Sequence, residues 1–177
     1  MTGKLRERMT LTSIGLLLAV ALRAAQGDSL PASVIPTGQS TVVETPHLQV
    51  RTTGGEAGAA PGGRVSLFVE VVPKPRMHVY APEQKTYLPV SIRMEPSPYV
   101  KVRPAVFPKG ESFFFAPTRE TQIVYSRPFR IELPVTVGRV RPAGAITLTG
   151  TLEYQACDDR VCYAPRKVPV TWVLHLQ

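Results

Sequence analysis

The sequence lacks three features that would each indicate a common class of protein. None of its apolar runs reaches the roughly 20 residues that a membrane-spanning helix needs; the uncharged apolar run LTSIGLLLAVAL has only 12 residues. No basic run is interleaved with aromatic residues, as in nucleic-acid-binding segments. No helical pattern of apolar residues extends beyond two turns. The sequence therefore predicts neither a membrane-embedded protein, nor a nucleic-acid-binding protein, nor a mainly helical domain.

Cysteine is also scarce, because the chain has only Cys157 and Cys162, within YQACDDRVCYAP. Their spacing is compatible with a structural disulfide, a metal site or a redox-active pair. Closing a loop of about six residues removes only ~2 kcal/mol of unfolded-state entropy, so the pair is a weak structural staple. His78 or His175 could complete a metal site, although the spacing matches no common zinc motif. The residues alone leave all three interpretations open.

The composition is that of one globular domain. The 177 residues are 44% hydrophobic and 19% charged, and they include 18 prolines and 13 glycines. Proline removes a backbone donor and is excluded from helix interiors, so this composition favours short strands and turns. Residues 1–27 hold four of the 21 basic and one of the 13 acidic residues, which leaves a net charge of +5 on the remaining chain. That dispersed charge favours solubility or contact with acidic surfaces.

Residues 1–27 have the pattern of a secretory signal peptide. A basic segment precedes the apolar run at 11–22, and small residues at 25 and 27 predict cleavage before Asp28. An uncleaved anchor is the alternative, and Arg23 at the end of the run disfavours it. No cysteine directly follows this apolar run, so lipid attachment is not expected. Export would bring the cysteines to a compartment in which disulfides persist.

The rest of the chain has the pattern of an all-β domain. Residues 28–60 are rich in Gly, Pro, Ser and Thr and predict a flexible tether that ends in an edge strand near 47–51. Beyond it, apolar and polar residues alternate in short segments separated by Pro and Gly. The segments expected to be strands are 64–72, 77–80, 88–94, 100–107, 121–126, 129–137, 145–154 and 167–176. They predict an immunoglobulin-like antiparallel β-sandwich over residues 61–177.

The cysteines lie between the last two of these segments, both of which are expected to be core strands. Such a connection lies at one end of a sandwich, where a partner can reach it. Asp158 and Asp159 suit a tight turn there, because aspartate side chains bond to nearby backbone groups. Trp172 is expected to pack in the core.

The residues around the cysteines resemble a motif of the DsbD N-terminal domain family, the periplasmic domain of thiol:disulfide interchange proteins. The motif is YQAC followed by CYAP, and MHVYAPEQKTYLPVSIRM, VFPKGESFFF and IVYSRPFRIELPVTV extend the resemblance over residues 61–177. It implies an immunoglobulin-like domain without a cofactor. It also implies that a cysteine pair shuttles reducing equivalents from a membrane-embedded thiol reductase to periplasmic thioredoxin-like proteins, as in cytochrome c biogenesis.

The resemblance also implies roles for particular residues. Cys162 would form the mixed disulfide with a partner, and Cys157 would resolve it. An aromatic loop with acidic residues shields the pair in the family. Three consecutive phenylalanines in a strand must place at least one ring on the solvent side, as a cover for the thiols or a partner contact. The expected shielding or supporting residues are Tyr154, Tyr163, His78, Tyr80, Phe113, Phe114, Phe115 and Glu111.

Two departures from the family pattern leave other functions open. Four residues separate the cysteines, where the best-known members have five. The sequence contains no transmembrane or thioredoxin-like portion, so a separate membrane donor or acceptor is expected. One alternative is a secreted binding or chaperone-like β-sandwich with a purely structural disulfide. The other is a copper- or zinc-binding protein that uses the thiols with Met77 and His78.

Overall fold

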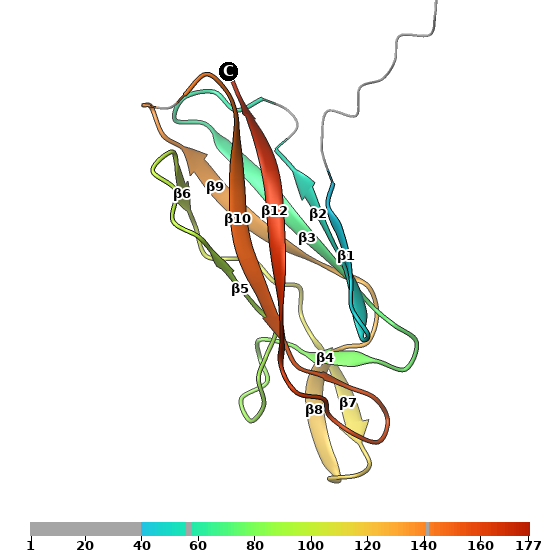
Figure 1. Ribbon diagram of the computed structural model, residues 1–177. Coiled ribbons are helices and arrows are strands. Elements are labelled where there is room, and N and C mark those ends of the chain that lie inside the picture. The colour runs from blue at the N-terminus through green and yellow to red at the C-terminus, as the bar shows by residue number, and fades with distance from the viewer. Residues whose placement is uncertain (1–39, 56–57, 141) are drawn as a thin grey trace, which may run out of the picture. The chain divides into compact units, whose positions relative to one another are not determined.

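The computed structural model describes residues 40–55, 58–140 and 142–177 (Figure 1). The predicted signal peptide and the first part of the tether lie outside these residues. Within the described part, the chain forms strands and no α-helix. That part therefore holds no helix long and apolar enough to cross a membrane. The strands are β1 (Val42–Glu44), β2 (Leu48–Gly54), β3 (Arg64–Pro73), β4 (His78–Tyr80), β5 (Ser91–Met94), β6 (Val100–Val102), β7 (Glu111–Phe115), β8 (Glu120–Tyr125), β9 (Phe129–Val137), β10 (Gly144–Tyr154), β11 (Ala156–Cys157) and β12 (Arg166–Leu176).

Two antiparallel sheets form the sandwich. One has the strand order β1-β2-β3-β9-β6 and the other has the order β12-β10-β5. Figure 1 shows β10 and β12 lying over the sheet that contains β3 and β9. Trp172 of β12 is 1% exposed, and its indole nitrogen donates a hydrogen bond of 3.1 Å to the carbonyl oxygen of Phe68 in the facing sheet. The predicted immunoglobulin-like antiparallel sandwich is confirmed, as is the core position of Trp172.

Alternation of side chains explains why these segments form core strands. Leu67, Val69 and Val71 of β3 are fully buried, as the period of two predicts. The inward positions of the last strands are buried too; they are Ile146, Leu148, Leu152, Tyr154, Val168, Val170, Trp172, Leu174 and Leu176. β10 and β12 pair from Gly144↔Leu176 to Tyr154↔Arg166, so the cysteine segment connects two neighbouring antiparallel strands.

The folded domain begins earlier in the chain than the sequence predicted. β1 and β2 lie within residues 28–60, and β2 pairs with β3 along its whole length. Leu48 is 0% and Val50 1% exposed, and both belong to the main core. The tether therefore cannot extend to residue 60, because alternating burial in β2 makes that segment a sheet strand rather than a linker. β1 is the edge strand of this sheet, in place of the expected 47–51.

A third, smaller sheet places the cysteines. Its strand order is β11-β4-β8-β7, and Figure 1 shows β4, β7 and β8 at the end of the sandwich away from the C-terminus. One face carries Val79 and Tyr125, which belong to the main core. The other face carries Tyr80 and Cys157, which form a second apolar cluster with Val124. We call this second group the cysteine cluster; Tyr87 and Phe113 pack against it.

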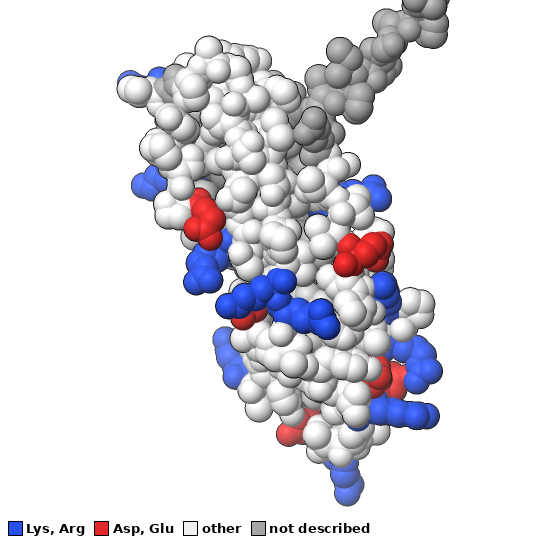
Figure 2. Space-filling model, in the orientation of Figure 1, with Lys and Arg blue, Asp and Glu red and all other residues white. Residues whose placement is uncertain are grey.

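The charged side chains form no single-sign patch on the face shown in Figure 2. Lys and Arg residues are spaced over that face, and Asp and Glu residues lie between them. This arrangement agrees with the dispersed charge of the sequence.

Candidate active site

Cys157 and Cys162 are joined by a disulfide, with their Cα atoms 3.9 Å apart. Cys157 ends β11 and faces His78 of β4 in the antiparallel pairing. Backbone hydrogen bonds close the loop on both sides of the pair, from Asp158 to Val161 and from Tyr163 to Ala156. Cys157 is 0% exposed, whereas Cys162 is exposed. The two sulfur-bearing residues therefore differ in accessibility although they share one bond.

Asp158 holds the short loop between the cysteines in a turn. Its carboxylate accepts hydrogen bonds from the backbone nitrogens of Arg160 and Val161, at 2.8 and 2.9 Å, and from the Tyr163 hydroxyl at 2.7 Å. These bonds favour the charged form, chiefly the one from the Val161 nitrogen, and they lower the pKa of Asp158 from 3.8 to about 2. Asp159 instead forms a surface ion pair with Arg76 at 3.0 Å. The predicted turn role of the acidic pair is thus confirmed for Asp158.

Replacing Asp158 with Asn should lower the thermal unfolding midpoint at pH 7. The amide oxygen can still accept the backbone hydrogen bonds, but the charge that strengthens them is lost. Because the folded-state pKa is depressed, the contribution is present in wild type above about pH 4 and is lost as the pH falls through about 2. The difference between wild type and Asp158→Asn should therefore close at about pH 2 in melts followed by circular dichroism. Asp159→Asn is the matched control and should have little effect; an Asp158→Asn difference that stays constant with pH would contradict this role.

The Tyr80 hydroxyl contacts both sulfur atoms. It lies 3.1 Å from Sγ of Cys157 and 3.2 Å from Sγ of Cys162. A disulfide sulfur carries no hydrogen, so the phenol is the donor in either contact. Tyr80 is 0% exposed, and burial raises its pKa to about 12, which keeps the hydroxyl protonated. The site therefore presents a fixed hydrogen-bond donor to the atoms that would carry charge when the disulfide opens.

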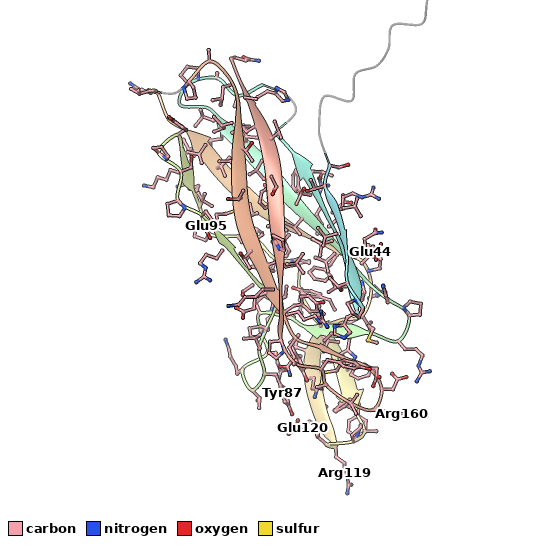
Figure 3. The ribbon with its side chains drawn as sticks, viewed as in Figure 1. Glu44, Tyr87, Glu95, Arg119, Glu120 and Arg160 are labelled. Carbon is pink, nitrogen blue, oxygen red and sulfur yellow. A yellow bond between two sulfur atoms is a disulfide. The ribbon has the colours of Figure 1, made fainter. Side chains whose placement is uncertain are left out.

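Tyr87 covers Tyr80 and is tied to the turn between β7 and β8. Its ring stacks on Tyr80 with centroids 4.7 Å apart and an interplanar angle of 7°. Its hydroxyl donates a hydrogen bond of 2.5 Å to Glu120, which also accepts one from Thr118 at 3.1 Å. Figure 3 shows Tyr87 and Glu120 together at the end of the molecule that carries β7 and β8. Sequence reasoning missed both residues; the one available signal was an aromatic residue between Pro82 and Pro89, in the segment that precedes β5.

The three phenylalanines of β7 alternate between two faces. Phe113 packs against the cysteine cluster, and its ring centroid is 4.4 Å from that of His78. Phe115 is 4% exposed, with its centroid 6.2 Å from that of His78. Phe114 faces the other way and is 62% exposed. Phe113 and Phe115 thus enclose the surroundings of Cys157, and Phe114 is left available for contact with another molecule.

Two polar side chains are buried beside the cysteine cluster. His78 is 2% and Gln122 1% exposed. Nε2 of His78 and both side-chain amide atoms of Gln122 have no hydrogen-bond partner. Burial lowers the pKa of His78, and the charges of Asp159 and Asp158 and the neighbouring Gln122 side chain oppose this shift. Most buried polar groups in proteins are paired, so these unpaired atoms need an explanation.

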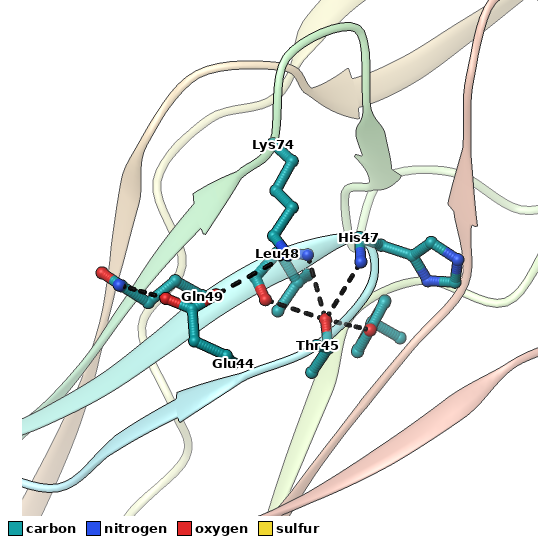
Figure 4. Close-up of polar contacts among 7 residues, drawn as sticks. Glu44, Thr45, His47, Leu48, Gln49 and Lys74 are labelled. Carbon is teal, nitrogen blue, oxygen red and sulfur yellow. Dashed lines mark hydrogen bonds and ion pairs between the residues drawn. The ribbon is translucent and has the colours of Figure 1, made fainter.

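The two tyrosines that flank the cysteines pack away from the sulfurs in the contacts they make. Tyr154 is 0% exposed in the main core, and its hydroxyl donates to the Thr45 hydroxyl at 2.9 Å. Thr45 in turn accepts hydrogen bonds from the backbone nitrogens of the turn between β1 and β2 (Figure 4). Tyr163 stacks on His47 of that turn, with centroids 4.5 Å apart. These contacts join the cysteine loop to the sandwich.

Glu111 pairs across β7 and β8 with Val124 of the cysteine cluster, but its carboxylate bonds elsewhere, and His175 lies far from the cysteines. Glu111 accepts hydrogen bonds from the Ser126 nitrogen and from Arg127, at 3.0 and 2.8 Å, at the opposite end of the β7–β8 hairpin from Glu120. His175 pairs with Ala145, at the end of the β10–β12 ladder away from the cysteines, roughly 30 Å along the strands at ~3.3 Å per residue. No group of three or more His, Cys, Asp or Glu in the described part of the chain could hold a metal ion.

Residues 48–172 match the family described as the N-terminal domain of the thiol:disulfide interchange protein DsbD. The chain belongs to this family. The N-terminal periplasmic domain of ScsB from Proteus mirabilis is similar in structure, with a TM-score of 0.51 and 20% sequence identity over 76% of this chain. The match spans 50% of that ScsB chain. The reduced N-terminal domain of Neisseria meningitidis DsbD gives a TM-score of 0.40 and 18% identity over 62% of this chain and 82% of that one.

A comparison with curated proteins found no match. The family assignment and the Cys157–Cys162 disulfide together support thiol–disulfide exchange as the general chemistry of this DsbD N-terminal domain relative.

Proposed function

We propose that the domain carries reducing equivalents in the periplasm between a membrane-embedded thiol reductase and thioredoxin-like proteins. The observation that carries this proposal is the asymmetry of the disulfide, in which Cys162 is exposed and Cys157 is 0% exposed. A purely structural bridge needs no accessible sulfur, whereas exchange requires one that a partner thiolate can attack. The domain acts as a thiol–disulfide oxidoreductase-type electron shuttle and needs no cofactor.

Reduction of the domain proceeds through a mixed disulfide at Cys162. A partner thiolate attacks Sγ of Cys162, the new intermolecular S–S bond forms, and Cys157 leaves with the electron pair and takes up a proton. A second partner thiol then displaces Cys162, which leaves the partner oxidised and both cysteines of the domain as thiols. Delivery of the electrons to an acceptor protein is the same sequence in reverse. The Tyr80 hydroxyl stabilises the sulfur that leaves, because it already lies within hydrogen-bonding distance of both atoms.

The cover made by Tyr87, Phe113 and Phe115 makes the exchange selective. It encloses Tyr80 and the buried side of the disulfide and leaves the Cys162 side open. An attack at Cys162 must still separate the enclosed Cys157 sulfur from the pair, so small thiols would reduce the disulfide slowly until a docked partner displaces the cover. Phe114 and the 51% exposed Val161 next to Cys162 offer apolar surface for such docking.

Periplasmic localisation is part of this proposal. It is supported by the family match and by the export signal predicted for residues 1–27, which lie outside the described structure. In this compartment the pair would be reoxidised unless a membrane carrier supplied electrons continuously.

A redox titration tests the proposal. The domain is equilibrated with glutathione or dithiothreitol buffers, and thiols are counted by mass spectrometry after alkylation. We expect two thiols to appear together at a potential above about −300 mV, the level below which structural disulfides lie. We also expect the reduced domain to stay folded, since the short loop contributes only ~2 kcal/mol. A pair that stays oxidised to below about −300 mV would contradict the shuttle and favour a structural disulfide in a binding module.

A further inference from the structure

We propose that His78 is the proton acceptor for Cys157 when the reduced pair closes to the disulfide. This assignment rests on the proposed shuttle and adds to it the route of the proton. It explains why a histidine, and not an apolar residue, lies in the buried surroundings of Cys157.

The strand pairing places His78 opposite Cys157. The two residues are direct partners in the antiparallel β4–β11 pair, and side chains at such positions lie on one face of the sheet with Cβ atoms about 4.5–5.5 Å apart. Both side chains are buried, at 2% and 0% exposed. Buffer bases therefore cannot reach the Cys157 thiol, so its proton needs an acceptor within the protein.

The unpaired Nε2 atom of His78 is such an acceptor. In the oxidised domain it has no hydrogen-bond partner, and the sulfur of Cys157 has no hydrogen to donate. Reduction adds an S–H donor to Cys157, and rotation about its Cα–Cβ bond can direct this hydrogen towards the facing imidazole. In the tautomer that carries its proton on Nδ1, Nε2 offers a lone pair. The atom that lacks a partner in the disulfide form therefore gains one in the dithiol form.

The surroundings of His78 favour the neutral base before the reaction and tolerate the cation after it. The rings of Phe113, Phe115 and Tyr80 pack around the imidazole, and burial lowers its pKa. The carboxylates of Asp158 and Asp159 act in the opposite sense and stabilise the protonated form. Arg76 is paired with Asp159, and the Gln122 side chain, buried nearby on β8, also favours the protonated form.

The disulfide closes from the mixed-disulfide intermediate. In the mixed disulfide, Cys162 is bonded to the sulfur of the partner and Cys157 is a thiol. The proton of Cys157 moves to Nε2 of His78 as the Cys157 sulfur attacks Sγ of Cys162. The Cys157–Cys162 bond forms, the bond between Cys162 and the partner breaks, and the partner sulfur leaves as a thiolate with the electron pair. The partner is reduced, the domain is oxidised, and the imidazolium then returns its proton to solvent.

Reaction of the reduced domain with 5,5′-dithiobis(2-nitrobenzoate) separates closure by Cys157 from the first attack by Cys162. Attack by Cys162 releases one thionitrobenzoate in a phase that depends on reagent concentration. Closure by Cys157 releases the second in a phase that does not. We expect His78→Gln to leave the first phase unchanged and to slow the second about 100-fold, the lower range for general base catalysis. The wild-type second phase should be level above about pH 6.5, whereas that of the variant should rise towards pH 8.5, near the ordinary thiol pKa.

His47→Gln is the matched control, because His47 is a second buried histidine with an unpaired ring nitrogen and stacks on Tyr163 instead of facing Cys157. Its second phase should keep the wild-type rate and pH profile. His78→Phe, which suits the aromatic surroundings, replaces His78→Gln if that variant does not fold. A second phase that is unchanged in the His78 variants, or equally slowed in His47→Gln, would overturn the assignment. Absence of the first phase in the reduced wild type would instead refute the shuttle itself, and the assignment with it.

Discussion

The Cys157→Ser variant should accumulate a stable mixed disulfide with a thioredoxin-like protein, and the Cys162→Ser variant should form almost none. Cys162 is exposed and can attack a partner, but without Cys157 the intermolecular bond cannot be resolved. In the reverse variant the remaining thiol is 0% exposed, beneath Tyr80 and the β7 side chains. We expect the difference in trapped complex to be at least about tenfold, because access to the sulfur governs the exchange rate.

The trapping is measured with a variant of a thioredoxin-like protein that keeps a single exposed cysteine. This cysteine is activated as its mixed disulfide with thionitrobenzoate. Release of thionitrobenzoate gives the rate, and non-reducing electrophoresis with mass spectrometry gives the amount of complex. The variant with both cysteines replaced by serine is the blank. Equal trapping by the two single-cysteine variants would show that burial of Cys157 does not direct the attack.

The second large effect is expected at the cover. Tyr87→Ala should speed reduction of the disulfide by dithiothreitol roughly tenfold, because it removes both the ring stacked on Tyr80 and the hydrogen bond to Glu120 that fixes it. Tyr87→Phe keeps the ring but loses the hydrogen bond, so its rate should lie between those of wild type and Tyr87→Ala. Glu120→Gln should behave like Tyr87→Phe.

The rates are followed by quenching with acid at intervals and counting alkylated thiols. Tyr99→Ala is the control, since Tyr99 is a 37% exposed tyrosine next to β6, which belongs to a sheet of the sandwich and not to the third sheet. If Tyr87→Ala were reduced no faster than Tyr99→Ala, Tyr87 would be a packing residue and the selectivity of the site would need another source.

Much of the fold follows from local sequence pattern. The alternation in β3, β10 and β12 identified these strands and their buried faces, because a period of two is set by the backbone of each strand alone. β2 has the same alternation, but the surrounding Gly, Pro and Thr residues concealed it. β11 is only two residues long and is defined by its pairing with β4, so no local pattern could reveal it.

The residues of the site likewise divide into those that local sequence predicts and those that depend on strand pairing. The turn role of Asp158 is local chemistry within the cysteine loop and was predictable. Tyr87 lies in the loop between β4 and β5 and Glu120 begins β8, and the two meet only because β4 pairs with β8 in the third sheet. Closeness in sequence to the phenylalanines favours Glu111, whose carboxylate binds Ser126 and Arg127. The hairpin turn brings Glu120, at the other end of the strand pair, to Tyr87. Contacts of this kind depend on strand pairing, which sequence alone did not define.

We propose that Cys157 and Cys162 exchange two electrons with a thioredoxin-like protein. The most direct measurement mixes the reduced domain with an oxidised thioredoxin-like protein and counts the thiols of both proteins over time by acid quenching, alkylation and mass spectrometry. We expect that the two thiols lost from the domain appear on the partner, and that the reduced partner returns them to the oxidised domain. Thiols that stay on the domain, or a domain disulfide that the reduced partner leaves intact, would contradict it.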